Sequence, residues 1–231
     1  MGGQACVLYG AAEFSRDLDI TLLASPENLA RLGNALADLQ AEPIAVPPFE
    51  REYLERGHAV HFRCHRPDTE GMRLDVMSRM RGVAPFPELW DRRTILTVED
   101  AQEIDVLSLP DLVTAKKTQR DKDWPMIRRL VEANYESFYA EPTPERIRFW
   151  LREMRTPELL AEVAARFPQD ARFVSDTRAA VELARSGRID DVQRALDEEM
   201  ERERHADREY WRPLRHELEQ LRRQRARDRG V

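Results

Sequence analysis

The feature of this sequence that most restricts its fold is a change in hydrophobic spacing along the chain. Segments in which apolar and polar residues alternate all lie before residue 108, and from Pro144 onward the spacing is helical almost to the end. Alternation is typical of half-buried strands, and a spacing of three to four residues is typical of amphipathic helices. The sequence therefore predicts an α/β (α+β) fold, with a small mixed sheet and flanking helices followed by an all-helical C-terminal region.

The boundary between these two parts is predicted from a cluster of prolines. Glu141-Pro142-Thr143-Pro144 interrupts the helical spacing, so we expect one domain at residues 1–139 and a helical domain at residues 140–231. Further breaks are expected to divide the second domain into several helices, near Pro157, Pro168 and Ser186-Gly187.

The first part contains several short elements. Strands are expected at residues 17–24, 59–64, 72–77 and 103–107. Ser25-Pro26 is typical of a helix start, because it puts a capping hydroxyl before a proline at the first turn. Glu70-Gly71 favours a turn that joins two of the strands into a β-hairpin. Helices are also expected at residues 3–12, 109–120 and 123–135.

Composition excludes some classes of protein. The chain has 43 acidic and 37 basic side chains, a net charge of -6, which argues against a general nucleic-acid coat protein. There is no run of about 18 apolar residues, so no membrane span is expected. The N-terminus lacks the pattern of a secretory signal, and the spacing of Cys6 and Cys64 suits neither a disulfide framework nor a zinc module. We therefore expect a cytoplasmic protein.

Three aspartates in predicted strands are the main candidates for chemistry. Asp17 and Asp19 are two residues apart, so the period of a strand places both carboxylates on one face. Asp75 lies within another apolar strand, where a charge is costly to bury without a partner. Such carboxylates repel each other unless a cation lies between them, and Mg²⁺ prefers oxygen ligands. If the two strands are neighbours, the cluster can hold two Mg²⁺ ions and support an in-line phosphoryl displacement.

A glycine pair precedes these aspartates. Gly2-Gly3 opens a short helix of small residues, and glycine lets a backbone approach phosphate oxygens closely. A helix N-terminus also favours anions. A glycine pair alone is typical of an ordinary turn or a flexible end. The informative feature is that this pair precedes a strand with two aspartates separated by one residue (D-x-D).

This order of motifs resembles the nucleotidyltransferase superfamily, whose fold is shared by DNA polymerase beta and many small bacterial transferases. The match lies in GGQACVLYGAAEFSRDLDI, which fits a G-G or G-S step followed by D-h-D, where h is apolar. Its matching residues are Gly2, Gly3, Asp17, Leu18 and Asp19. Downstream, DVLSLPDLVTAKKTQRDKDWPMIRRL is similar to the lysine-bearing helices of AbiEii-type and minimal nucleotidyltransferases. The resemblance covers residues 2–135 and does not extend to residues 140–231.

The resemblance implies a reaction and a site. A nucleoside monophosphate would pass from an NTP such as ATP to an acceptor hydroxyl, with release of pyrophosphate. The acceptor would be RNA, a small molecule or a protein side chain, and likeness to the AbiEii group adds a tRNA-modifying toxin of a toxin–antitoxin pair. Asp17, Asp19 and Asp75 would bind the metals, and Asp75 could help to deprotonate the acceptor. The nucleotide-binding residues would be Gly2, Gly3, Ser15, Lys116, Lys117, Arg120, Lys122 and Asp123.

The sequence also departs from the family pattern. Many relatives carry an arginine where this chain has Glu13, and they have an apolar strand before the glycines where this chain has only Met1. We therefore expect that an N-terminal strand is missing. These departures favour a second hypothesis, a catalytically inactive nucleotidyltransferase-like module that binds or regulates. A third hypothesis is a helical interaction protein in which residues 144–231 bind a partner chain.

Two groups of residues have competing interpretations. Asp123 can simply cap the helix that contains Pro125, and the neighbouring lysines can form a solvated face. His58, His61 and His65 with Cys64 suggest a metal site, but no further ligands cluster nearby. The sequence favours exposed polar residues on one side of the hairpin for this second group.

Overall fold

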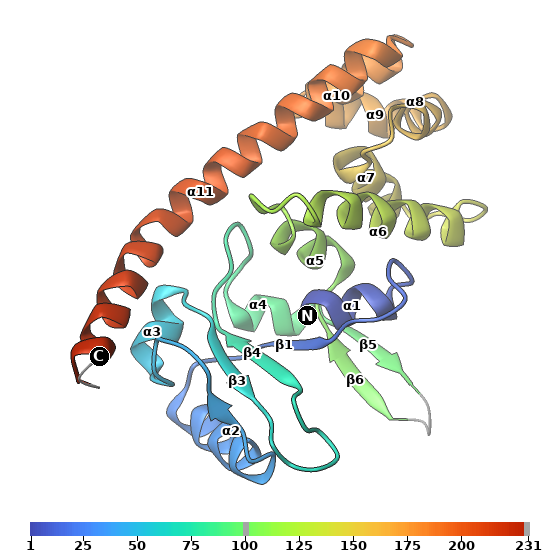
Figure 1. Cartoon of the computed structure of the whole chain (residues 1–231). Coiled ribbons are helices and arrows are strands. Elements are labelled where there is room, and N and C mark those ends of the chain that lie inside the picture. The colour runs from blue at the N-terminus through green and yellow to red at the C-terminus, as the bar shows by residue number, and fades with distance from the viewer. Residues whose placement is uncertain (99–101, 229–231) are drawn as a thin grey trace. The chain divides into compact units, whose positions relative to one another are not determined.

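A computed structural model of the chain describes residues 1–98 and 102–228 (Figure 1). These residues divide into two compact units. The first unit takes in Met1–Leu8, Ala12–Ala115 and the part of the chain from Glu209 onward, and the second takes in Tyr9–Ala11 and Lys116–Arg208. The predicted α/β class with a helical C-terminal region is confirmed. The boundary predicted at residues 139–140 lies inside the second unit, between two of its helices.

The first unit contains the strands of the described residues (Figure 1). The strands are β1 (Asp17–Thr21), β2 (Glu42–Pro43), β3 (Val60–Arg63), β4 (Arg73–Met77), β5 (Thr94–Thr97) and β6 (Glu103–Val106). The helices that lie wholly in this unit are α1 (Gly2–Leu8), α2 (Pro26–Asp38), α3 (Arg51–Arg56), α4 (Phe86–Asp91) and α5 (Leu109–Ala115).

The main sheet is mixed, with the strand order β1-β4-β3-β2. β1 runs parallel to β4, and β4 is antiparallel to β3, so the predicted hairpin is confirmed. Gly71 takes a positive φ of 76° in the hairpin turn, a conformation that glycine adopts without the steric cost of a Cβ. β5 and β6 form a separate antiparallel pair.

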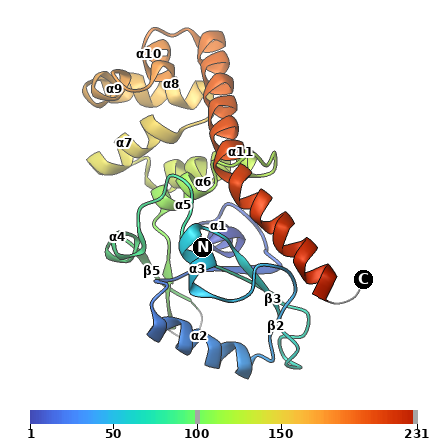
Figure 2. The ribbon, with the colours of Figure 1, turned by 90° about the vertical axis from the view of Figure 1, so that its left-hand side faces the viewer.

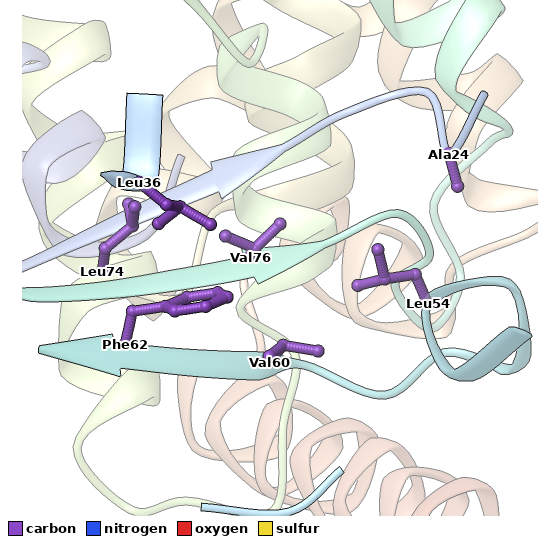
Figure 3. Close-up of a cluster of buried hydrophobic side chains, with 7 residues drawn as sticks. All are labelled: Ala24, Leu36, Leu54, Val60, Phe62, Leu74 and Val76. Atoms are coloured by element: carbon purple, nitrogen blue, oxygen red, sulfur yellow. The ribbon is translucent and has the colours of Figure 1, made fainter. Parts of the chain in front are cut away.

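The core of this unit lies on one face of the main sheet, and Figure 3 shows its most buried side chains. Leu74 and Val76 of β4 and Val60 and Phe62 of β3 are almost completely buried. The core also includes Leu18, Ile20 and Leu22 from β1 and its end, and Leu29, Leu32 and Leu36 from α2. Because strand side chains alternate between faces, Asp17, Asp19 and Asp75 must lie on the opposite face from this core.

Helix α2 begins where the sequence predicts. The Ser25 hydroxyl accepts a hydrogen bond from the backbone nitrogen of Asn28 at 3.3 Å, and Pro26 occupies the first turn. This cap satisfies one of the backbone N–H groups that a helix start leaves without a partner.

The second unit is helical, and Figure 2 shows its short helices. They are α6 (Asp123–Phe138), α7 (Pro144–Glu153), α8 (Pro157–Arg166), α9 (Pro168–Ser175) and α10 (Ala179–Arg185). The last helix, α11 (Ile189–Asp228), contributes its residues up to Arg208 to this unit and its residues from Glu209 to the first unit. The breaks predicted near Pro157, Pro168 and Ser186-Gly187 are confirmed.

A buried arginine joins several helices of the second unit. The Arg178 guanidinium donates to the carbonyl oxygens of Leu151 and Met154, at 2.8 and 3.0 Å, and pairs with Glu199 at 2.9 Å. These carbonyls lie at the end of α7, where a helix leaves its C=O groups without intrahelical partners. Arg178 therefore caps α7 and links it to α11.

None of the helices within the described ranges combines the length and the apolar character that crossing a bilayer requires.

Candidate active site

The face of the main sheet opposite the core carries two rows of charged side chains. Strand register places Asp19 of β1 beside Asp75 of β4, and Asp75 beside His61 of β3. The adjacent row, one pleat away, runs from Asp17 through Arg73 to Arg63. Neighbouring strands lie about 4.8 Å apart, so side chains in one row are direct neighbours. The predicted meeting of Asp75 with the D-x-D strand therefore occurs.

Asp75 is the most enclosed of the three aspartates. Arg73 holds its carboxylate with both arms of the guanidinium, from Nε to Oδ1 at 2.8 Å and from Nη2 to Oδ2 at 2.9 Å. His61 Nδ1 lies 2.8 Å from the same Oδ1. The same Nδ1 lies 3.2 Å from Arg73 Nη2, which can only donate, so the protonation of the ring decides which of these two contacts is a hydrogen bond. Arg73 and His61 thus supply the partners that a buried carboxylate requires.

The electrostatics of the two rows follow from these contacts. Burial acts to raise the pKa of the Asp75 carboxyl, but hydrogen bonds from His61 and Arg73 outweigh it, and the pKa lies below its ordinary value. The hydrogen bond to Asp75 raises the pKa of Arg73, and the charges of Asp75, Asp17 and Asp19 add to this effect. One guanidinium therefore interacts with all three carboxylates.

The glycine pair lies against Asp19. Gly2 has a φ of 66°, and a Cβ built on it would overlap the Asp19 carboxyl group. The backbone nitrogen of Gly3 donates to Asp19 Oδ2 at 3.3 Å, and the amino group of Met1 donates to the Asp19 carbonyl at 2.8 Å. The absence of side chains at Gly2 and Gly3 is thus what lets this backbone approach the second aspartate of the D-x-D motif.

Ser15 lies next to the same segment. A Cβ built on Gly3 would overlap the Ser15 hydroxyl, which itself donates to the Asp17 carbonyl at 3.0 Å. The side chain of Gln4 donates to the Ser15 carbonyl at 2.9 Å. The structure therefore brings together Gly2, Gly3, Ser15, Asp17, Asp19 and Asp75, all in the first unit.

The chemistry of this face suits a hard cation. Asp17 and Asp19 are only partly buried, and the next residue on that face, Thr21, has a buried hydroxyl with no hydrogen-bond partner among the described residues. Carboxylate and hydroxyl oxygens are the ligands that Mg²⁺ prefers. Asp75 could add its carboxylate to these ligands only if its hydrogen bonds with Arg73 were broken. As the side chains stand, no three acidic, imidazole or thiol groups within residues 1–98 and 102–228 surround a common ion position.

The remaining predicted residues lie in the second unit and make their own contacts there. Asp123 is 2% exposed and accepts hydrogen bonds from Thr118 at 2.5 Å, Arg120 at 2.7 Å and Lys116 at 3.4 Å. Burial acts to raise the pKa of Asp123, but Lys116, Thr118 and Arg120 together lower it below its ordinary value. Asp123 is thus the centre of a buried polar cluster at the start of α6.

The two other lysines of this segment differ in their surroundings. Lys117 pairs with Glu153 at 2.8 Å, and both of these side chains are largely buried. Lys122 is exposed and precedes the first residue of α6. The sequence interpretation of Asp123 as a simple helix cap is too narrow, because its carboxylate ties together the loop that precedes the helix.

Sequence reasoning missed two residues of the charged face. Arg73 lies two residues before Asp75 on the same strand, so the period-two argument applied to the aspartates could have found it. His61 was predicted to be merely exposed, and His58 likewise. His58 is in fact 1% exposed, and its Nε2 lies 2.7 Å from Oε2 of Glu217 in the last part of α11. A contact across 159 positions leaves no local signal in the sequence.

Comparison of the chain with known protein families, curated proteins and solved structures finds no match.

Proposed function

We propose that this chain is a Mg²⁺-dependent nucleotidyltransferase that moves a nucleoside monophosphate from an NTP to an acceptor hydroxyl and releases pyrophosphate. One observation carries the proposal. Asp17 and Asp19 share a face with Asp75 on the neighbouring strand, and the backbone of Gly2 and Gly3 lies against Asp19. The residues whose order resembles the nucleotidyltransferase superfamily thus lie close together in the first unit. We propose that the protein acts in the cytoplasm, where NTPs and acceptor hydroxyls are present.

Each residue of the cluster has a role in this proposal. Asp17, Asp19 and Asp75 would hold the metal, which when bound would neutralise charge on the triphosphate. Gly2 and Gly3 keep the space beside Asp19 free of side chains, and Ser15 orders the chain that leads into β1. Asp75, once released from Arg73, would take part in accepting the proton of the acceptor hydroxyl.

A second candidate function has its own supporting observation. Arg73 already neutralises Asp75 through a two-armed hydrogen bond, and this is what a site without a metal would require. In that case the chain is a nucleotidyltransferase-like module that binds or regulates without catalysis. The two candidates differ in whether the hydrogen bonds between Arg73 and Asp75 break when a nucleotide binds.

Label transfer distinguishes these candidates. The protein is incubated with Mg²⁺, each α-labelled NTP and one of three acceptor pools: total RNA, cell protein or small metabolites. We expect label on one class of acceptor with the wild type and a loss of at least a hundredfold with Asp17→Asn, since removing charge at a metal ligand removes transition-state stabilisation. Asp38→Asn, at the exposed end of α2, is the matched control and should retain full transfer.

The outcomes have separate meanings. Transfer that survives in Asp17→Asn would remove the carboxylate cluster from the mechanism. NTP binding without transfer to any pool would favour the binding or regulatory module.

A further inference from the structure

A cavity of about 600 Å³ lies in the first unit, and none of the three aspartates lines it. Its walls come from the segment after β1, the loop after β4, helix α3 and Tyr210 of α11. Leu22 and Ser78, the residues that directly follow β1 and β4, both line it. The cavity therefore lies at the carboxyl ends of two parallel strands, where open α/β sheets commonly bind ligands.

The charged part of the lining is mainly cationic. The charged residues that line it are Arg51, Arg79, Arg81 and one acidic residue, Glu55. Glu55 is already paired with Arg51, at 2.8 Å from its Nε. Arg79 is exposed and makes no ion pair or hydrogen bond with any residue in the part of the chain that the structure describes. Arg79 thus lines the cavity with a guanidinium whose donors no other described residue uses.

The rest of the lining is largely apolar. Met80, Val83, Phe86 and Tyr210 are among the residues that line it. The Tyr210 hydroxyl packs against Gly57, where a Cβ would come within 2.6 Å of the hydroxyl oxygen. An aromatic ring and an aliphatic wall beside an arginine suit a molecule with an apolar body and one anionic group.

We propose that this cavity is a binding site for a small organic anion, a carboxylate or phosphate ester carried on an aromatic or apolar body. Its volume falls within the range of about 300–1,000 Å³ that small-molecule sites occupy. The forked guanidinium of Arg79 matches carboxylate and phosphate oxygens, and Phe86 and Met80 cover the apolar body. The site does not depend on the proposed nucleotidyl transfer, because it shares no residue with the charged face.

Methyl NMR on the full chain tests this site with two simple probes. Methionine methyl groups are labelled with ¹³C, and the protein is titrated with phenyl phosphate and, separately, with benzoate. We expect a saturable shift of the Met80 methyl signal and no shift of Met154, which is fully buried in the second unit. The stronger probe identifies the anionic group that the site prefers. Phenol, which keeps the ring without the anion, should bind at least about tenfold more weakly.

Variants localise the binding. Arg79→Gln should weaken it about tenfold or more, because a hydrogen bond to a charged group is worth about 1.5–3 kcal/mol. Arg31→Gln removes an exposed arginine of α2 that does not line the cavity and should leave binding unchanged. Ala84→Phe keeps the charges and fills the space, so it should abolish the Met80 shift, with circular dichroism confirming its fold. Asp17→Asn should bind the probes as the wild type does.

Two results would overturn the proposal. One is the absence of a saturable Met80 shift with both probes at millimolar concentration. The other is equal binding by Arg79→Gln, Arg31→Gln and the wild type.

Discussion

At the scale of single residues, Asp19 is confined from two sides. Asp75 lies beside it in the next strand, and the backbone of Gly2 and Gly3 covers it from α1. The position of the Asp19 carboxylate therefore depends on Gly2 and Gly3, which have no side chain that could move aside. Arg73 has the complementary role, because its charge offsets the repulsion among the three carboxylates.

Replacement of Gly2 by alanine should displace the Asp19 carboxylate. Two effects combine in Gly2→Ala: a Cβ that overlaps Asp19, and a positive φ that costs a residue with a Cβ about 1–2 kcal/mol. We expect NTP affinity in the presence of Mg²⁺ to fall at least about tenfold, measured by calorimetry. Gly10→Ala is the control, because Gly10 has a similar φ of 76° but open space around it. Equal NTP binding by both variants would show that the function of Asp19 does not depend on the absence of a side chain at Gly2.

The Arg73–Asp75 pair predicts a pH-dependent stability. The folded-state pKa of Asp75 lies below the ordinary 3.8, so the pair stabilises the fold above that pH and loses this effect as pH falls through the folded pKa. Arg73 is 39% exposed, and solvent screening limits the contribution to about 1–2 kcal/mol. The free energy of unfolding of Arg73→Gln should therefore lie below that of the wild type by this amount at pH 7.

Urea unfolding across a pH series measures this difference. The gap between wild type and Arg73→Gln should narrow below about pH 4, where carboxyls with ordinary pKa values become protonated. Arg31→Gln serves as the control and should show a much smaller trend, because Arg31 is only a minor cause of the lowered pKa of the fully exposed Glu27. A gap that stays constant from pH 7 to pH 3 would mean that the pair does not depend on the Asp75 charge.

At the scale of elements, the strands of the site are readable from the sequence. The alternation around Asp17 and Asp75 predicts two of the strands, and the turn at Gly71 predicts that the Asp75 strand forms a hairpin with the strand before it. The cross-strand register is not readable, because it depends on how side chains from α2 and β3 fill the core. The contact of Asp75 with His61 follows from that register. Arg73 lies on the same strand as Asp75 and was within reach of the period-two argument, but the site was predicted as a metal cluster without this internal cation.

Several short elements were not predicted. β2, β5, α3 and α4 have two to six residues each, too few for a hydrophobic period to stand out. The helix predicted at residues 109–120 ends earlier, at Ala115. Thr118 and Arg120, which follow, contact Asp123 at the start of α6 instead of continuing the helix.

The cap of α2 gives a prediction at this scale. Ser25→Ala removes the acceptor for the Asn28 backbone nitrogen and should lower the free energy of unfolding by about 1 kcal/mol. Ser25→Asp restores an acceptor and should recover most of the loss. Guanidinium unfolding of the three proteins provides the test, and equal loss in both variants would count against the capping role.

At the scale of the whole molecule, the chain's last helix contributes to both units. The part of α11 from Glu209 groups with the first unit, where Glu217 accepts from the buried His58 and pairs with Arg56 at 3.1 Å. The segment from Glu201 onward is a dense mixture of Arg, Glu and Asp, a pattern that is typical of a solvated helix with salt-bridge pairs. In the structure, one carboxylate of that segment, Glu217, is the partner of His58 Nε2, 159 positions away in the sequence.

Glu217→Ala should therefore destabilise the protein. It leaves the His58 ring without its carboxylate partner, and a buried polar group that loses its partner costs about 1–3 kcal/mol. Glu219→Ala, two residues away, breaks only an exposed pair with Arg223 and should cost less than about 0.5 kcal/mol. Chemical unfolding at pH 7 compares them, and the prediction is wrong if the two variants lose the same stability.

The most direct test of the account is calorimetric titration with a non-hydrolysable ATP analogue, with and without Mg²⁺. The proposed carboxylate cluster predicts binding that requires Mg²⁺ and that falls at least about tenfold in Asp19→Asn, with Asp38→Asn unchanged. Binding that is the same without Mg²⁺ and in Asp19→Asn would contradict a metal–triphosphate site at these three aspartates.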